Sequence, residues 1–200
     1  MKIMVVGATG TIGKAVAALL EQNHEVVRVG HRDGDHRVDL GSRASIEALF
    51  NAVGPLDAVV STAGAAGFGP FAQLDDDAFE LALSNKLMGQ VNLARTGMDR
   101  VNEGGSITLT SGVLSRQPIP GSVAVSMANG ALESFAKAAA LEIGRGVRVN
   151  VVSPVFVKET MELMGMDPTP GVSAADTARA YKVAVESDVN GATLDVPDYL

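Results

Sequence analysis

The chain has 200 residues, a formal net charge of −7 and no cysteine. Its length fits a single domain, and its apolar fraction of 46% allows a sizeable core. The missing cysteines exclude disulfides, thiolate metal sites and thiol catalysis, while the acidic balance argues against a nucleic-acid partner. The first apolar run is too short for a signal peptide or a membrane span, so we expect a cytoplasmic protein that does not bind membranes. The histidines lack the spacing of a zinc motif, so no metal is expected.

Short apolar runs alternate with amphipathic stretches along the whole chain. Strands are predicted at residues 3–6, 25–30, 37–40, 57–61, 106–111, 147–153 and 192–196, and helices at 11–22, 42–53, 75–101, 122–143 and 173–187. Ser42 is the expected N-cap of the second helix. This alternation predicts one doubly wound α/β domain over residues 1–200, a Rossmann fold with a mostly parallel sheet and helices on both faces. Ligands bind beyond the carboxyl ends of such strands.

A glycine-rich turn follows the first strand, and residues 7–13 read Gly-Ala-Thr-Gly-Thr-Ile-Gly. Glycines allow a tight turn and let a pyrophosphate approach the backbone, while the helix that follows offers free N–H groups. Strand, turn and helix in this order predict a dinucleotide site, with a ligand-free structural turn as the alternative. The expected cofactor residues are Gly7, Thr9, Gly10, Thr11, Ile12 and Gly13.

The end of the second strand indicates which dinucleotide binds. An acidic residue there usually holds the ribose hydroxyls of NAD, but this chain has Gly30, His31 and Arg32. Arg32 can bind a 2′-phosphate bidentately with help from His31, so NADP is expected in preference to NAD. A solvated surface arginine is the alternative, and the neighbouring Asp33 and Asp35 weaken the NADP interpretation.

Several blocks of the chain, taken in order, resemble the short-chain dehydrogenase/reductase family over nearly the whole length. They are the turn at 7–13, with the G-x-x-G-x-x-G spacing of the extended and atypical branches, and then Asp39-Leu40, residues 61–64, Asn85-Lys86, residues 105–112 and residues 148–154. The resemblance implies an oxidoreductase of small molecules. It places Asp39, Leu40, Ala63, Gly64, Pro154 and Val157 beside the cofactor, although Asp39 is also explained as the residue that leads the next helix.

The chain departs from the family at its central motif. A Tyr and, four residues later, a Lys normally transfer the proton and hold the nicotinamide ribose, but Val125 and Asn129 occupy these positions. Val125 cannot exchange a proton, whereas Asn129 can still hydrogen-bond a ribose hydroxyl. Losing a positioned general acid costs roughly a hundred- to ten-thousand-fold in rate. Three hypotheses therefore stay open. The first is an NADP(H)-dependent reductase with a divergent active site, and the second is a non-catalytic NADP(H)-binding redox sensor or interaction protein. The third is a structural homologue that binds no nucleotide.

Three polar residues are the candidates for catalysis: Ser111, Asn85 and Asn129. Ser111 is expected to donate to a substrate oxygen, although Gly112 is an alternative match to the family's serine. Asn85 matches the family's structural and catalytic asparagine, or else ties its helix to a strand. Lys86 is expected to be a solvated helix residue.

The loop at about 154–171 is shorter than the family's substrate lid and rich in Met, Pro and Gly. Its apolar side chains either cover a flat, apolar small molecule or form a satellite core. The helices at 76–101 and 122–143 are expected to form a homodimer or homotetramer, because the second carries more small and apolar residues than one buried face needs.

Overall fold

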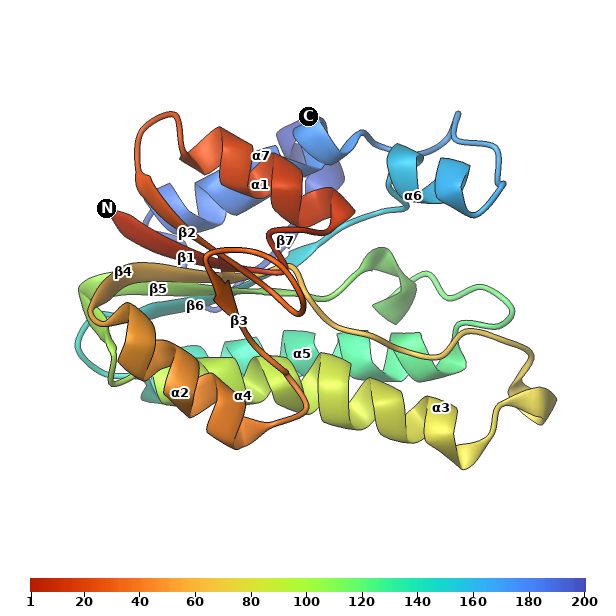
Figure 1. Cartoon of the computed structure of the whole chain (residues 1–200). Helices are drawn as coiled ribbons and strands as arrows, with labels where there is room; N and C mark the ends of the chain where they lie inside the picture. The colour runs from red at the N-terminus through yellow and green to blue at the C-terminus, as the bar shows by residue number, and fades with distance from the viewer.

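The sheet determines where a ligand can bind. In a computed structural model, which describes residues 1–200, seven parallel strands form one sheet in the order β3-β2-β1-β4-β5-β6-β7 (Figure 1). The strands are β1 (Lys2–Val6), β2 (Glu25–Gly30), β3 (His36–Arg37), β4 (Leu56–Ser61), β5 (Val101–Thr110), β6 (Arg148–Ser153) and β7 (Thr193–Asp195). The chain changes its winding direction between β1 and β4, which opens a crevice at the carboxyl ends of these two strands. The predicted fold class is confirmed.

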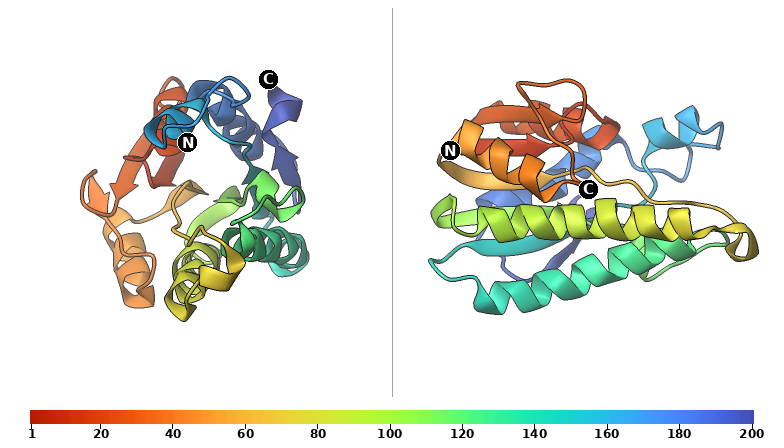
Figure 2. Two further views of the ribbon diagram at one scale, coloured as in Figure 1. Left: turned by 90° about the vertical axis from the view of Figure 1, so that its right-hand side faces the viewer. Right: turned by 60° about the horizontal axis from the view of Figure 1, so that its bottom comes forward.

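Helices cover both faces of the sheet (Figures 1 and 2). One face carries α1 (Thr11–Leu20) and α7 (Ala174–Glu186), and the other carries α2 (Arg43–Val53), α4 (Met88–Gly97) and α5 (Val123–Glu142). Alternation along β1 sends Ile3 and Val5 into the core beneath α1 and α7, and Met4 and Val6 into the core beneath the other helices. None of the helices is long and apolar enough to cross a bilayer.

The predicted helix at 75–101 is helical from Asp76 to Gly97, but it contains a π turn and ends four residues earlier than expected. Helix α3 (Asp76–Leu81) is capped by Asp75 and runs into a π-helical turn, Ala82–Leu87, before α4 begins. The Met88 amide donates to the Leu83 carbonyl five residues earlier, and the chain enters β5 at Val101. A π turn inserts one extra residue, which shifts the helical phase by about 100°. This shift is not visible in a 3.6-residue pattern.

Two shorter elements also differ from the prediction. The third strand is only His36–Arg37, because Asp39 accepts a hydrogen bond from the Gly41 amide and turns the chain toward α2. A helix missed in the sequence, α6 (Lys158–Leu163), lies in the loop after β6. The predicted N-cap at Ser42 is confirmed, since its side chain accepts from the Ser45 amide at 3.2 Å.

Candidate active site

The turn between β1 and α1 has the properties of a phosphate cradle. Gly7 has φ of +87°, and a Cβ on Gly13 would lie 2.0 Å from the Gly7 carbonyl oxygen. Gly10 is the N-cap of α1 and gives no side-chain cap, so the amides of Thr11, Ile12 and Gly13 donate to no acceptor in the protein. Three unpaired donors at a helix N-terminus, with no side-chain bulk in front of them, suit a diphosphate anion.

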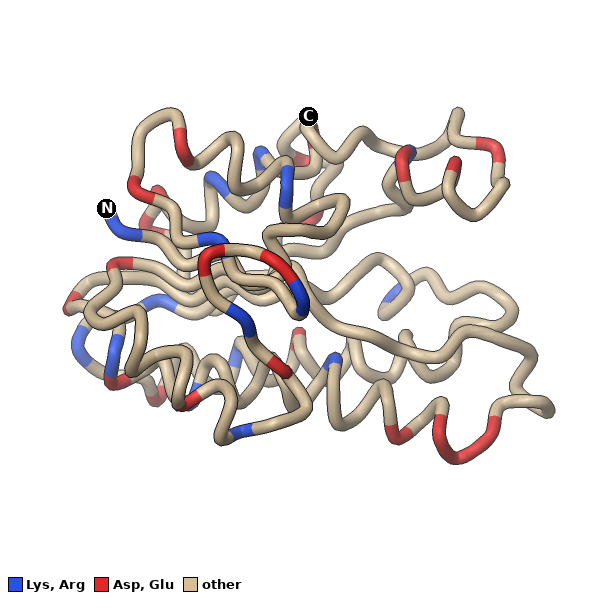
Figure 3. Tube along the Cα trace, in the orientation of Figure 1, with Lys and Arg blue, Asp and Glu red and all other residues tan.

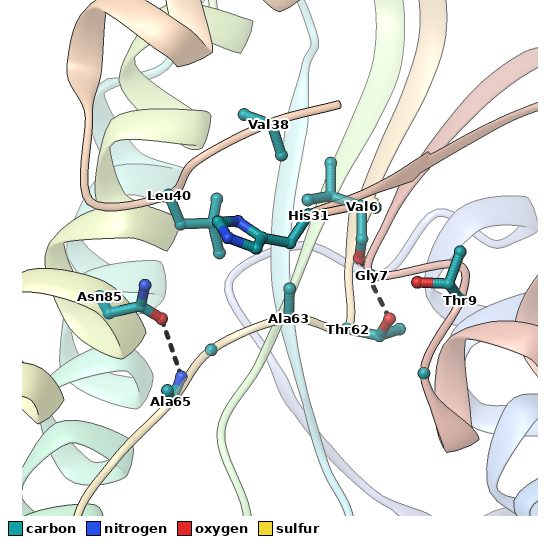
Figure 4. Close-up of a pocket in the computed structure, with 13 residues that line it drawn as sticks. Val6, Gly7, Thr9, His31, Val38, Leu40, Thr62, Ala63, Ala65 and Asn85 are labelled. Atoms are coloured by element: carbon teal, nitrogen blue, oxygen red, sulfur yellow. Dashed lines mark hydrogen bonds between the residues drawn. The ribbon is translucent and has the colours of Figure 1, made fainter. Parts of the chain in front are cut away.

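A cleft of about 450 Å³ opens beside this turn (Figure 4). Its walls come from the ends of β1, β2 and β4 and from the loop before α2, and they comprise Val6, Gly7, Thr9, Gly10, Gly30, His31, Val38, Leu40, Thr62, Ala63, Gly64, Ala65 and Asn85. The ring of His31 points toward Leu40 across this space. Asn85 Oδ1 accepts from the Ala65 amide at 2.8 Å and so holds the loop after β4 in place.

Two further hollows extend this cleft toward α5 and α6. A second cleft of about 270 Å³ shares Thr62 and Gly64 with the first one. It is lined by Ile12, Thr62, Gly64, Lys86, Thr110, Ser111, Gly112, Val113, Leu114, Val125, Asn129, Pro154, Val155 and Phe156. A third, also of about 270 Å³, shares its Val113, Leu114, Val155 and Phe156 walls and adds Met161. One elongated depression therefore leads from the glycine turn to the region of the missing Tyr and Lys.

Glu133 is the common partner of several polar side chains behind the second cleft. Its buried Oε1 accepts from Ser111 Oγ at 3.1 Å and from Ser115 Oγ at 2.6 Å, and its Oε2 lies 3.5 Å from Arg116 Nε. Arg116 also donates to Asp195, and this hydrogen bond lowers the pKa of the Asp195 carboxyl. The Ser111 proton is thus directed to a carboxylate, and the Arg116 charge is balanced by two acids. The sequence analysis did not single out Glu133.

Asn129 is buried one helical turn before Glu133. Its Nδ2 donates to the Gly112 carbonyl at 3.3 Å, while its Oδ1 is buried and has no hydrogen-bond partner. Buried polar atoms are nearly always paired, so an orphaned acceptor on a cleft wall is a site for a ligand donor. Asn129 and Ser111 therefore share the second cleft, whereas Asn85 lies in the first.

Lys86 is not a solvated helix residue, and that expectation is wrong. Its side chain is buried from the π turn, and its Nζ lies 3.5 Å from the Ser111 carbonyl oxygen. Burial disfavours the charged form and lowers the pKa of the ammonium to about 8. A spacing of four along the helix was the available signal, because Ala82, Lys86 and Gln90 share one buried stripe.

Known proteins resemble this chain over most of its length. A family model described as enoyl-(acyl carrier protein) reductase matches residues 6–191. Carbonyl reductase [NADPH] 2 from Sus scrofa is 31% identical over 180 residues, which cover 80% of this chain and 73% of that protein. This chain belongs to the short-chain dehydrogenase/reductase family. The same fold is found in the crystal structure of the protein lin1944 from Listeria innocua, with a TM-score of 0.93 and 39% identity over 98% of this chain and 99% of that one.

Members of similar size exist within the family. A crystal structure of a small-chain dehydrogenase in complex with NADPH has a TM-score of 0.86 and 28% identity, and the match covers 98% of this chain and 95% of that one. The match therefore leaves little of either chain uncovered. The loop after β6 begins at Pro154. This loop contains α6, and Met161 of that helix lines the third hollow.

Not every residue expected near the dehydrogenase cofactor lines the cleft. Arg32 is exposed just beyond His31 and is absent from the walls. The Asp39 carboxylate accepts a hydrogen bond from the Gly41 amide at 2.9 Å, as expected of a residue that leads into α2. Val157 is buried and pairs with Val172 in a parallel bridge. Thr11 and Gly13 contribute backbone at the turn instead of cleft walls.

Proposed function

We propose that this chain is an NADP(H)-dependent reductase whose active site works without the family's Tyr and Lys. The observation that carries the proposal is the continuous depression from the unpaired amides of α1 to Val125 and Asn129. The amides of residues 11–13 bind the pyrophosphate, and Asn129 Oδ1 accepts from the nicotinamide half. The bound cofactor supplies a hydride. The remaining walls hold the substrate and exclude water.

The preference for NADP rests on the end of β2. His31 lines the cleft and Arg32 follows it on the exposed side, so the imidazole ring and the guanidinium can both contact a 2′-phosphate. Of the two nearby acids, Asp35 already accepts a hydrogen bond from the Arg28 amide at 2.9 Å through its Oδ2. The name of the Sus scrofa relative and the NADPH complex of the small-chain dehydrogenase support the same choice.

The substrate is proposed to be a small, flat, uncharged carbonyl-type compound. Apolar side chains dominate the third hollow, among them Val113, Leu114, Ile119, Val155, Phe156 and Met161. Few Lys or Arg residues lie in the loops at the carboxyl ends of the strands, on the right of Figure 3. Arg116 is neutralised by Glu133 and Asp195, and Lys158 is exposed, so neither offers a site for an acidic substrate.

An anaerobic titration of NADPH, followed by fluorescence, tests the cofactor part of the proposal. The same samples, supplied with a panel of carbonyls, quinones and flavins, test turnover. We expect saturable binding and oxidation of NADPH with at least one class. Binding without turnover would overturn the reductase and favour the redox sensor, whereas no binding would overturn both.

Helices α4 and α5 are proposed to form the contact of a homodimer or homotetramer. They lie side by side (Figure 2), and a groove of about 360 Å³ between them is lined by Ala94, Arg95, Met98, Phe135, Ala138, Ala139, Glu142 and Ile143. Exposed Met88 and Met127 extend the apolar surface of the two helices. Light scattering is expected to give a dimer or tetramer mass, and a monomer at micromolar concentration would contradict this assignment.

A further inference from the structure

We propose that Lys86 is the proton donor of this active site, supplied by the helical segment before α4 in place of the missing Tyr on α5. The inference rests on the proposed reductase function and deepens it. Lys86 is the only titratable side chain among the fourteen residues that line the second cleft. Hydride addition to a carbonyl carbon leaves a developing charge on oxygen, which needs an acid within reach.

The local backbone brings Lys86 to this position. The π turn Ala82–Leu87 shifts the phase of the helix, and Lys86 becomes buried there between exposed Leu83 and Met88. The loop after β4 crosses directly over it, since a Cβ on Gly64 would lie 3.1 Å from Lys86 Cα. π turns inside α-helices are rare and occur frequently at functional sites. This one places an ammonium group beside a cleft.

Neither the tyrosines of the chain nor Ser111 is free for the donor role. The chain has two tyrosines, and the Tyr181 hydroxyl is fully buried beneath α7, where it hydrogen-bonds Thr110 Oγ1 at 2.7 Å. Tyr199 lies in the last 3₁₀ turn of the chain. The Ser111 hydroxyl directs its proton to Glu133 at 3.1 Å and presents lone pairs to any other neighbour.

Lys86 keeps free donor capacity because its environment does not neutralise it. The Ser111 carbonyl takes one N–H of the ammonium, and two remain. The loop after β4 and the end of β5 bring no titratable group to the cleft. From α5, Val125 and Asn129 line the cleft, and the carboxylate of Glu133 lies behind it. Glu133 pairs with Arg116, Ser111 and Ser115, and no carboxylate oxygen lies within 4.0 Å of Lys86 Nζ. Burial alone lowers the Lys86 pKa to about 8, which suits an acid that is protonated at neutral pH and releases its proton readily.

The proposed step balances as follows. The substrate carbon accepts the hydride from the reduced cofactor, and the electron pair of its C=O double bond moves to oxygen. One N–H bond of Lys86 breaks as its proton forms the new O–H bond, which leaves a neutral amine and an alcohol. Water then returns a proton to Lys86. Asn129 Oδ1 and the Ser111 carbonyl stay fixed during the step and orient the reacting groups.

Two Lys86 substitutions and one control test the inference. Lys86→Met removes charge and proton at similar length, Lys86→Arg keeps the charge but does not release a proton in this range, and Lys137→Met removes an exposed lysine from α5. We expect both Lys86 variants to lose a hundredfold or more in kcat while NADPH affinity changes less than threefold. The control should keep full activity. Turnover within threefold of wild type in Lys86→Met would overturn the inference and leave the reductase intact.

A spectroscopic readout does not depend on turnover. The chain has six lysines, so ¹³C labelling at lysine Cε gives a countable spectrum, and Lys86→Met assigns the buried one. We expect its resonance to titrate near pH 8 and to move when NADPH binds. A titration above pH 10, or no response to bound NADPH, would overturn the donor role. Failure of NADPH to bind at all would instead overturn the proposed function.

Discussion

Ser111 donates its hydroxyl proton to Glu133 Oε1 across 3.1 Å, in the interior behind the cleft. Because the Ser111 hydroxyl already donates its proton to Glu133, it stabilises the end of β5 and is not free to protonate a substrate. Ser111→Ala is therefore expected to lower kcat less than tenfold and the free energy of unfolding by about 1 kcal/mol. Steady-state kinetics and urea denaturation measure the two effects. A hundredfold loss of kcat at unchanged stability would show that Ser111 is the donor after all.

The glycine turn allows a matched pair of substitutions. A Cβ on Gly10 would meet only the Gly7 carbonyl oxygen, at 3.4 Å, whereas on Gly13 it would lie 2.0 Å from that atom. Gly10→Ala is expected to fold normally but to lose at least tenfold in NADPH affinity, because its methyl group stands where the pyrophosphate approaches. Gly13→Ala is expected to lower the melting temperature sharply. Equal NADPH affinity in Gly10→Ala and wild type would contradict the cradle.

Arg32 is expected to select the cofactor. Arg32→Ala should weaken NADPH binding tenfold or more and NADH binding less than twofold, because only NADPH carries the 2′-phosphate. Arg37→Ala is the control, since this residue is exposed on β3 and does not line the cleft. Calorimetry with both cofactors gives the comparison. Equal weakening of both would defeat the assignment.

Burying Lys86 should reduce stability in a pH-dependent way. Its pKa in the folded chain is about 8, below its value in the unfolded chain, so the folded state holds fewer protons between these two values. Stability of the wild type relative to Lys86→Met should therefore rise from pH 8 to about 10.4, the usual lysine pKa. Below pH 8 the variant should be more stable by on the order of 3 kcal/mol. Urea denaturation at pH 7 and pH 10 tests this, and a constant difference would refute it.

The sequence predicts features that local chemistry determines. Residues 7–13 follow an apolar strand and open a helix, and Ser42 precedes the first apolar residues of α2, so both assignments need only neighbouring residues. Lys86 was misjudged because its neighbours Ser84 and Asn85 are polar, although the spacing of Ala82, Lys86 and Gln90 indicated a buried stripe. Glu133 was missed because its partners Ser111, Ser115 and Arg116 follow β5, in and beside a 3₁₀ turn about 20 residues earlier in the sequence.

The most direct measurement is isothermal titration calorimetry of the protein with NADPH at pH 7, with NADH and the Gly10→Ala variant as comparisons. The account predicts saturable heat with NADPH, binding at least tenfold weaker with NADH, and a comparable loss in the variant. No heat with either cofactor would contradict it at its foundation, because the unpaired amides at the start of α1 would then serve no dinucleotide.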